Sequence, residues 1–145
     1  MSSTSAEQRA FVDSNVLVYA YDADAGEKTV RARALVRELR AARRGCVSIQ
    51  VLQEFFVTVT GKLPQQLDVP TAAAAVEAFS TWTTHAPASR DVLAAIELHR
   101  RAQISFWDAM IVRSASVLRC EVLYTEDLNA GQELDGVLVV NPFAS

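Results

Sequence analysis

The sequence predicts a three-layer α/β/α sandwich, with helices on both faces of a mainly parallel sheet of about five strands. Short apolar runs of strand length alternate with longer segments of helical periodicity, the pattern of parallel α/β folds. The chain has 145 residues, 50% of them hydrophobic, which is enough for one full core. Several acidic residues directly follow apolar runs, and parallel sheets bind ligands beyond the carboxyl ends of their strands.

The first part of the chain predicts two strands and two helices. Residues 10–12 and 46–49 are apolar runs of strand length. Between them, Ala32, Leu35, Val36 and Leu39 recur at helical spacing and predict a helix with one apolar stripe. Residues 50–60 predict a second helix, whose apolar face contains Val51, Leu52, Phe55, Phe56 and Val59.

The second part of the chain continues the alternation. Residues 71–81 follow Pro70, are rich in alanine and predict a helix, and further helices are expected over 91–102 and 106–118. Strands are expected over 84–86, 121–124 and 136–140. Both tryptophans are expected in the core, and Trp107 is placed with the apolar face of the last helix, which contains Met110, Ile111, Ala115 and Leu118.

Composition excludes several classes of protein. Residues 1–9 are expected to form a flexible tail before a single domain over 10–145, and this tail lacks the features of a signal peptide. No apolar run approaches the roughly 20 residues of a membrane span. Cys46 and Cys120 have no metal-ligand spacing and are expected to be buried thiols. We therefore expect a cytoplasmic protein that does not enter the membrane.

Familiar catalytic motifs do not account for this chain. It contains no glycine-rich nucleotide-binding motif, and glycines number only five. The only histidines are His85, which is expected to be structural, and His99, which is expected on a solvated helix face. Neither lies near a nucleophile motif, so a Ser-His-Asp triad is not predicted.

Four acidic residues lie where predicted strands give way to helices or loops. Asp13 and Asp127 each follow an apolar strand, whereas Glu54 and Asp108 lie in the first turns of helices. In a parallel sheet, strand ends and the beginnings of the following helices share one edge. The sequence therefore predicts that these four carboxylates converge there.

Each acid also has a purely structural interpretation. Asp13 fits an N-cap of the segment after it, and Ser105 with Asp108 fits a capping box. Asp127 fits a turn residue and Glu54 a solvated helix position. Four independent caps, however, have no reason to share an edge. Clustered carboxylates repel one another unless a cation is present, and hard oxygen ligands without histidine or cysteine suit Mg²⁺ or Mn²⁺.

The same residues resemble the motifs of PIN-domain nucleases. Residues 11–20, Phe-Val-Asp-Ser-Asn-Val-Leu-Val-Tyr-Ala, resemble the opening of these proteins. Gln-Glu-Phe at 53–55, Ser-Phe-Trp-Asp-Ala-Met-Ile at 105–111 and Leu-Tyr-Thr-Glu-Asp-Leu at 123–128 resemble the motifs of the other three acids. The resemblance extends from about residue 10 to 143. Within the superfamily, the chain most resembles the small VapC-type toxins of bacterial toxin–antitoxin pairs.

This resemblance implies a divalent metal (Mg²⁺ or Mn²⁺), endoribonuclease activity on RNA, a homodimer and a cognate antitoxin. It implies an acidic site of Asp13, Glu54, Asp108 and Asp127. Ser14, Asn15 and Thr125 are expected as polar helpers, and the place of Glu126 beside Asp127 stays open. One alternative is a catalytically inactive PIN-like module that binds RNA or protein. Another is a receiver or phosphatase with Asp13 as nucleophile, which would leave Glu54 without a role.

The positive charge of this chain is concentrated in one segment. The formal net charge is −3, yet seven of the 14 lysines and arginines lie between Lys28 and Arg44, where Glu38 is the only acid. Arg33, Arg37, Arg40 and Arg44 are expected to form a stripe along one helix. This stripe can contact RNA phosphates or an acidic antitoxin segment, or be only a solvated helix face.

Overall fold

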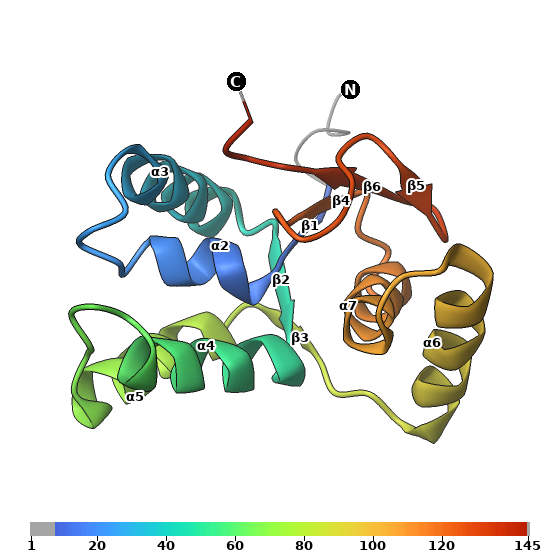
Figure 1. Ribbon diagram of the computed structural model, residues 1–145, viewed down its shortest axis with the longest axis horizontal. Helices are drawn as coiled ribbons and strands as arrows, with labels where there is room; N and C mark the ends of the chain where they lie inside the picture. Colours follow the sequence, from blue (N-terminus) through green and yellow to red (C-terminus); the bar gives the residue numbers. More distant parts are fainter. Residues whose placement is uncertain (1–7, 145) are drawn as a thin grey trace.

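The computed structural model describes residues 8–144 and shows a six-stranded sheet between two layers of helices (Figure 1). The strands lie in the order β3-β2-β1-β4-β6-β5, and every pairing is parallel except that of β5 with β6. Helices α2 to α5 lie on one side of the sheet, and α6 and α7 lie on the other. The predicted sandwich is therefore confirmed. The strands are β1 (Ala10–Val12), β2 (Gly45–Ser48), β3 (Thr83–His85), β4 (Val122–Tyr124), β5 (Glu133–Leu134) and β6 (Val137–Val140).

Helices α3 to α7 form where helices were predicted, whereas the short α2 was not predicted, and three of the predicted helices begin at a residue whose side chain caps them. Ser48, Asp68 and Ser105 each accept a hydrogen bond from a backbone N–H in the first turn of the helix that follows. No helix among the described residues is both long and apolar enough to cross a lipid bilayer. The helices are α2 (Ser14–Tyr19), α3 (Glu27–Ala42), α4 (Ile49–Gly61), α5 (Val69–Ser80), α6 (Ser89–Ala102) and α7 (Phe106–Val117).

The strand that the sequence did not predict is β5. It contains only two residues and pairs with β6 through a tight turn in which Asp135 and Gly136 both have positive φ values of 48° and 82°. Such a turn suits an antiparallel hairpin, and glycine adopts this conformation at little cost. Two residues are too few to produce a detectable alternation of polar and apolar side chains, so this strand could be found only in the structure.

The core lies on both faces of the central strands. Phe11, Val47 and Leu123 are completely buried in neighbouring strands. On the side of α4 and α5, the rings of Phe55, Phe79 and Trp82 pack edge to face. The Trp82 ring lies against Gly45, where an added Cβ would come within 2.4 Å of it. Trp82 is therefore buried as predicted, and the glycine at the beginning of β2 makes this packing possible.

Two residues of the predicted tail are described and are bound to the domain. The backbone N–H of Glu121 donates to the Arg9 carbonyl (3.0 Å), and the Arg44 guanidinium donates to the Gln8 carbonyl (3.2 Å). The rest of that prediction, residues 1–7, lies outside the described part of the chain.

Candidate metal centre

Three of the four predicted acids lie close together at the carboxyl edge of the sheet. One carboxylate oxygen from each of Asp13, Asp108 and Asp127 lies within 4.8 Å of the other two. We call these three residues the carboxylate cluster. Asp13 follows β1, Asp127 follows β4, and Asp108 lies in the first turn of α7, so each comes from a different element. The convergence predicted from the sequence is therefore present for these three.

Asp13 is held at the end of β1 by the sheet itself. Its N–H donates to the Tyr124 carbonyl (3.0 Å), which continues the β1–β4 ladder, and its side chain is only 4% exposed. One oxygen accepts from the Ser14 N–H (2.7 Å) and caps α2, whereas the other accepts from the Thr125 hydroxyl (2.9 Å). The capping interpretation and the cluster interpretation are thus both correct for this residue.

The pKa of Asp13 is raised from its ordinary value of 3.8 to about 7. Burial is the main cause, opposed by the hydrogen bonds from Thr125 and Ser14, and the charges of Glu54 and Asp127 raise it further. The pKa of Asp108 is also raised, mainly by burial and then by the same two neighbouring acids. A divalent cation would relieve both effects, and an all-carboxylate donor set suits Mg²⁺ or Mn²⁺. The residues present therefore fit such an ion.

Asn15 joins the two strand-end acids. Its amide nitrogen donates to Asp127 (3.1 Å), to the Thr125 hydroxyl (3.2 Å) and, at 3.4 Å, to Asp13. The Thr125 hydroxyl also accepts from the Asp127 N–H (3.1 Å), so Thr125 shapes the turn that carries Asp127. Asn15 and Thr125 thus contact the cluster directly, and the structure places both where the sequence predicted polar helpers.

Glu54 lies beside the carboxylate cluster but outside the set of mutually close oxygens. One of its oxygens accepts from the Ser14 hydroxyl (3.0 Å), and the other accepts from the Gln50 amide (3.2 Å). Gln50 was not predicted from the sequence, although its i, i+4 spacing to Glu54 on α4 is a usable signal. The hydroxyl of the third predicted helper, Ser14, therefore orients Glu54, and only its backbone N–H contacts the cluster, at Asp13.

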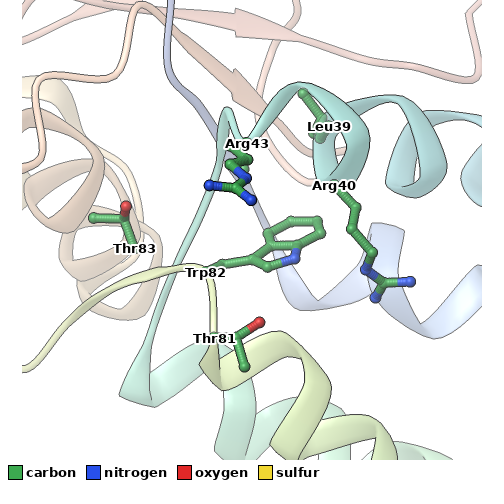
Figure 2. Close-up of a pocket in the computed structure, with 7 residues that line it drawn as sticks. Leu39, Arg40, Arg43, Thr81, Trp82 and Thr83 are labelled. Atoms are coloured by element: carbon green, nitrogen blue, oxygen red, sulfur yellow. The ribbon is translucent and has the colours of Figure 1, made fainter.

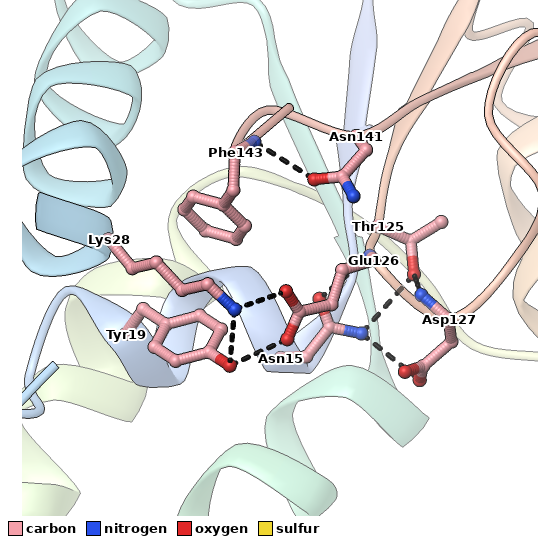
Figure 3. A network of polar contacts seen from close by, with 8 residues as sticks. All are labelled: Asn15, Tyr19, Lys28, Thr125, Glu126, Asp127, Asn141 and Phe143. Atoms are coloured by element: carbon pink, nitrogen blue, oxygen red, sulfur yellow. Dashed lines mark hydrogen bonds and ion pairs between the residues drawn. The ribbon is translucent and has the colours of Figure 1, made fainter. Parts of the chain in front are cut away.

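Figure 3 shows that Glu126 points toward Tyr19 and Lys28 and away from Asp127, the next residue in the chain. Its carboxylate accepts from the Tyr19 hydroxyl (2.6 Å) and forms an ion pair with Lys28 (2.9 Å). Its backbone N–H donates to the Asn15 side chain (3.3 Å). Glu126 is therefore an anchor for the loop after β4. The receiver interpretation would need a lysine close to Asp13. Lys28 instead pairs with Glu126, so it gives that interpretation no support.

One of the two hydrogen bonds of the predicted capping box is present at the beginning of α7. The Ser105 hydroxyl accepts from the Asp108 N–H (3.0 Å), but among the described contacts the Asp108 carboxylate makes no return bond to the Ser105 backbone. That carboxylate lines an open hollow of about 270 Å³ together with Asp127, Asn129 and Gln132. The oxygens of Asp108 therefore remain available beside a space that a ligand can enter.

The expected burial of Trp107 is wrong. Its side chain is 63% exposed, because the first turn of α7 projects at the carboxyl edge, before the helix enters the core at Ala109. Helical periodicity placed Trp107 on the same stripe as Met110, but it could not show where the core ends.

The predicted arginine stripe is shorter than expected. Arg43 adopts a left-handed conformation (φ 56°) that ends α3 at Ala42, so Arg44 is not on the helix. Arg33, Arg37 and Arg40 do share one side of α3, where they line a hollow of about 320 Å³. Among the described residues, these three make no ion pair with an acid.

A second hollow, of about 430 Å³, contains Arg40 and Arg43 above the Trp82 ring (Figure 2). It is also lined by Gly45 and Thr83, the first residues of β2 and β3. This end of the basic surface therefore lies at the amino edge of the sheet, opposite the carboxylate cluster.

Comparisons with known proteins agree with this geometry. A family model described as PIN domain matches residues 10–132. No curated protein matches the chain by sequence.

Three solved structures have a similar fold. A toxin–antitoxin complex from Klebsiella pneumoniae has a TM-score of 0.68 at 19% identity, over 92% of this chain and 98% of that one. VapBC2 from Rickettsia felis, bound to a promoter DNA fragment, has a TM-score of 0.62 at 13% identity, over 91% and 97%. Mycobacterium tuberculosis VapC20, a toxin that cleaves the sarcin–ricin loop, has a TM-score of 0.62 at 20% identity, over 81% and 89%.

Proposed function

Since the chain belongs to the PIN-domain family, we propose that it is an Mg²⁺- or Mn²⁺-dependent endoribonuclease and the toxin of a type II toxin–antitoxin pair. The observation that carries this proposal is the carboxylate cluster, with its oxygens within 4.8 Å of one another beside an open hollow. A buried Asp13 and a half-buried Asp108, close to a third acid and without a cationic partner among the described residues, are costly in a fold that has no use for them.

Asp13, Asp108 and Asp127 would hold the metal. The ion would lower the pKa of a bound water and neutralise charge on the scissile phosphate. The chain positions these ligands rigidly, because Asp13 is fixed by the β1–β4 ladder and Asp127 by Asn15 and Thr125. Glu54 is the candidate for accepting a proton from the attacking water, since Ser14 and Gln50 orient it beside the cluster and outside it.

A cleavage assay with a matched control tests this assignment. Asp13→Asn keeps the shape of the side chain but removes its charge. Asp68→Asn is the control, because Asp68 also caps a helix, accepting from the Thr71 N–H at 2.8 Å, but is exposed and outside the cluster. We expect cleavage of labelled RNA by the wild type and Asp68→Asn in Mg²⁺ or Mn²⁺, none in a chelator, and none by Asp13→Asn.

Equal cleavage by Asp13→Asn and the wild type would contradict the catalytic role. Binding of RNA by the wild type without metal-dependent cleavage would favour the alternative, a PIN-like module that binds without cutting.

We further propose a homodimer with a cognate antitoxin, since similar structures include VapBC complexes. The position of Arg40 and Arg43 at the amino edge favours an acidic antitoxin segment over the scissile region of RNA. Arg37→Ala with Arg40→Ala should weaken antitoxin binding and leave cleavage intact. Weakened cleavage with a reduced salt dependence would instead assign these arginines to RNA.

A further inference from the structure

Trp107 is the only exposed aromatic side chain among residues 8–144, and it directly precedes Asp108 of the carboxylate cluster. We propose that its indole is a stacking platform for one unpaired nucleobase of the RNA next to the scissile phosphate. This assignment rests on the proposed endoribonuclease function and adds to it a contact with the base. It makes the preferred substrate single-stranded at that nucleotide, because a paired base cannot present its face.

The position of Trp107 supports this contact. The residue lies in the first turn of α7, at the carboxyl edge of the sheet. Gln50 ties it to the site, because its amide nitrogen donates both to the Trp107 carbonyl (3.3 Å) and to Glu54 (3.2 Å). The backbone that carries the indole is therefore fixed to one of the acids of the site.

The orientation of the indole is also partly fixed. The half-buried Phe106 ring meets it edge to face, with centroids 5.0 Å apart and planes at 70°. This contact supports the indole on one side, and Trp107 remains 63% exposed. A supported aromatic face that loses little rotational freedom on binding suits stacking, which every base permits because every base has a π face.

The surroundings favour a nucleotide over an apolar protein partner. Trp107 is next to Asp108 in the chain and is linked through Gln50 to Glu54. A protein surface covering the indole would also desolvate these carboxylates, which is unfavourable without a counter-charge. A nucleotide places its base on the indole while its phosphate meets the cation held by the acids.

Fluorescence of a Glu54→Gln protein in Mg²⁺ tests the contact directly, because this variant keeps the three acids that would hold the cation and lacks the proposed proton acceptor. Trp82 is buried but lines the basic hollow at the amino edge, so the same titration of Trp107→Phe identifies any signal from Trp82. Quenching that is equal in Trp107→Phe would overturn the assignment to Trp107. The probes are a short oligouridylate and a ribose-phosphate oligomer of equal length without bases. We expect the oligouridylate to quench the emission and the abasic oligomer not to. Equal response to both probes, no response, or quenching by protein concentration alone would overturn the proposal.

Cleavage kinetics provide the second readout. For a single-stranded substrate, Trp107→Ala should raise KM by about 5- to 100-fold, the range expected for loss of one stacked base. Trp107→Phe should restore most of the affinity. Leu93→Ala is the control, because Leu93 is equally exposed but lies on α6, and it should leave KM unchanged. Trp107→Ala should have no effect on a substrate that lacks the flanking base.

Different results would contradict the endoribonuclease proposal and the stacking proposal. If the wild type cleaves RNA and Trp107→Ala changes nothing, only the stacking contact is overturned. If the oligouridylate quenches Trp107 but no protein cleaves RNA, the endoribonuclease proposal fails and the stacking surface stands.

Discussion

Asp13 and Asp91 are both almost fully buried, at 4% and 2% exposure, yet their surroundings are opposite. Asp91 accepts from the Ala88 N–H (2.8 Å) and from the Arg113 guanidinium (2.9 Å), and His85 lies 3.5 Å away. The Ala88 hydrogen bond is the main reason that the pKa of Asp91 is lowered. Asp13 has only neutral hydrogen-bond donors and two acidic neighbours, and its pKa is raised to about 7.

The difference separates a structural carboxylate from one that we propose to be functional. The fold supplies a counter-charge where a buried acid only holds elements together. Asp91 does so between the beginning of α6, Arg113 on α7 and His85 at the end of β3. At the carboxyl edge the fold gathers three acids and supplies no cation from its own side chains among the described residues. Such an arrangement is expected where an external cation completes the site.

The largest expected effect comes from removing the charge of Asp108, whose carboxylate makes no ion pair among the described residues. Asp108→Asn should reduce RNA cleavage by about 100-fold or more, equivalent to about 2.7 kcal/mol of transition-state stabilisation. Its melting temperature should stay close to that of the wild type, because the N-cap bond uses the Asp108 backbone and not its side chain. A parallel loss of folding would show that Asp108 is structural, as Asp91 is.

Removing the paired acid should do the opposite. Asp91→Ala leaves Arg113 and the Ala88 N–H without their partner, and we expect a loss of about 2–4 kcal/mol of unfolding free energy. Urea denaturation measures this loss. Cleavage per folded molecule should persist, since Asp91 is outside the carboxylate cluster. A stable but inactive Asp91→Ala protein would contradict the comparison.

The pH dependence of stability should distinguish the two acids. Since folding raises the pKa of Asp13 from 3.8 to about 7, the metal-free folded state holds a proton that the unfolded state has lost between these values. The contribution of Asp13 to the free energy of unfolding is therefore complete below about pH 4 and is lost as the pH rises to about 7. Asn at position 13 does not titrate.

At pH 8 without metal, Asp13→Asn should therefore be more stable than the wild type by about 1–3 kcal/mol. This range takes about 1.4 kcal/mol for each unit by which folding raises the pKa of Asp13, and it subtracts the hydrogen bonds that the variant loses. The gap should close near pH 4. Mg²⁺ should stabilise the wild type and not the variant. A wild type that is as stable as the variant in a chelator at pH 8 would contradict the raised pKa.

The smallest expected effect concerns the anchor behind Asp127. Lys28→Met removes the exposed ion pair with Glu126, which is worth about 0–1 kcal/mol, and loosens the loop that carries Asp127. We expect the Mg²⁺ concentration for half-maximal cleavage to rise about 2- to 5-fold. Arg31→Met is the matched control, because Arg31 pairs with Glu27 on the surface of α3 at 3.6 Å. Equal changes in both variants would assign the effect to net charge.

The positions of Asp13, Asp108 and Asp127 could be predicted because each depends on local signals. Apolar runs mark the strand ends, helical periodicity marks the beginning of α7, and the parallel connection brings these ends to one edge. Whether Glu126 belongs to the acidic site could not be predicted, because adjacent residues after a strand point in different directions. Only the contacts of Tyr19 and Lys28 show which acid faces away.

The sequence by itself determined the layered fold, the segments that form its main strands and the acids that gather at the carboxyl edge. The tertiary structure alone decided what surrounds each charged or aromatic side chain. It gave Asp91 a half-buried arginine partner and left Asp13 without a cation, it exposed Trp107, and it ended α3 before Arg44. The physical reason is that periodicity is a local property of the chain, whereas burial and pairing depend on elements that are distant in the sequence.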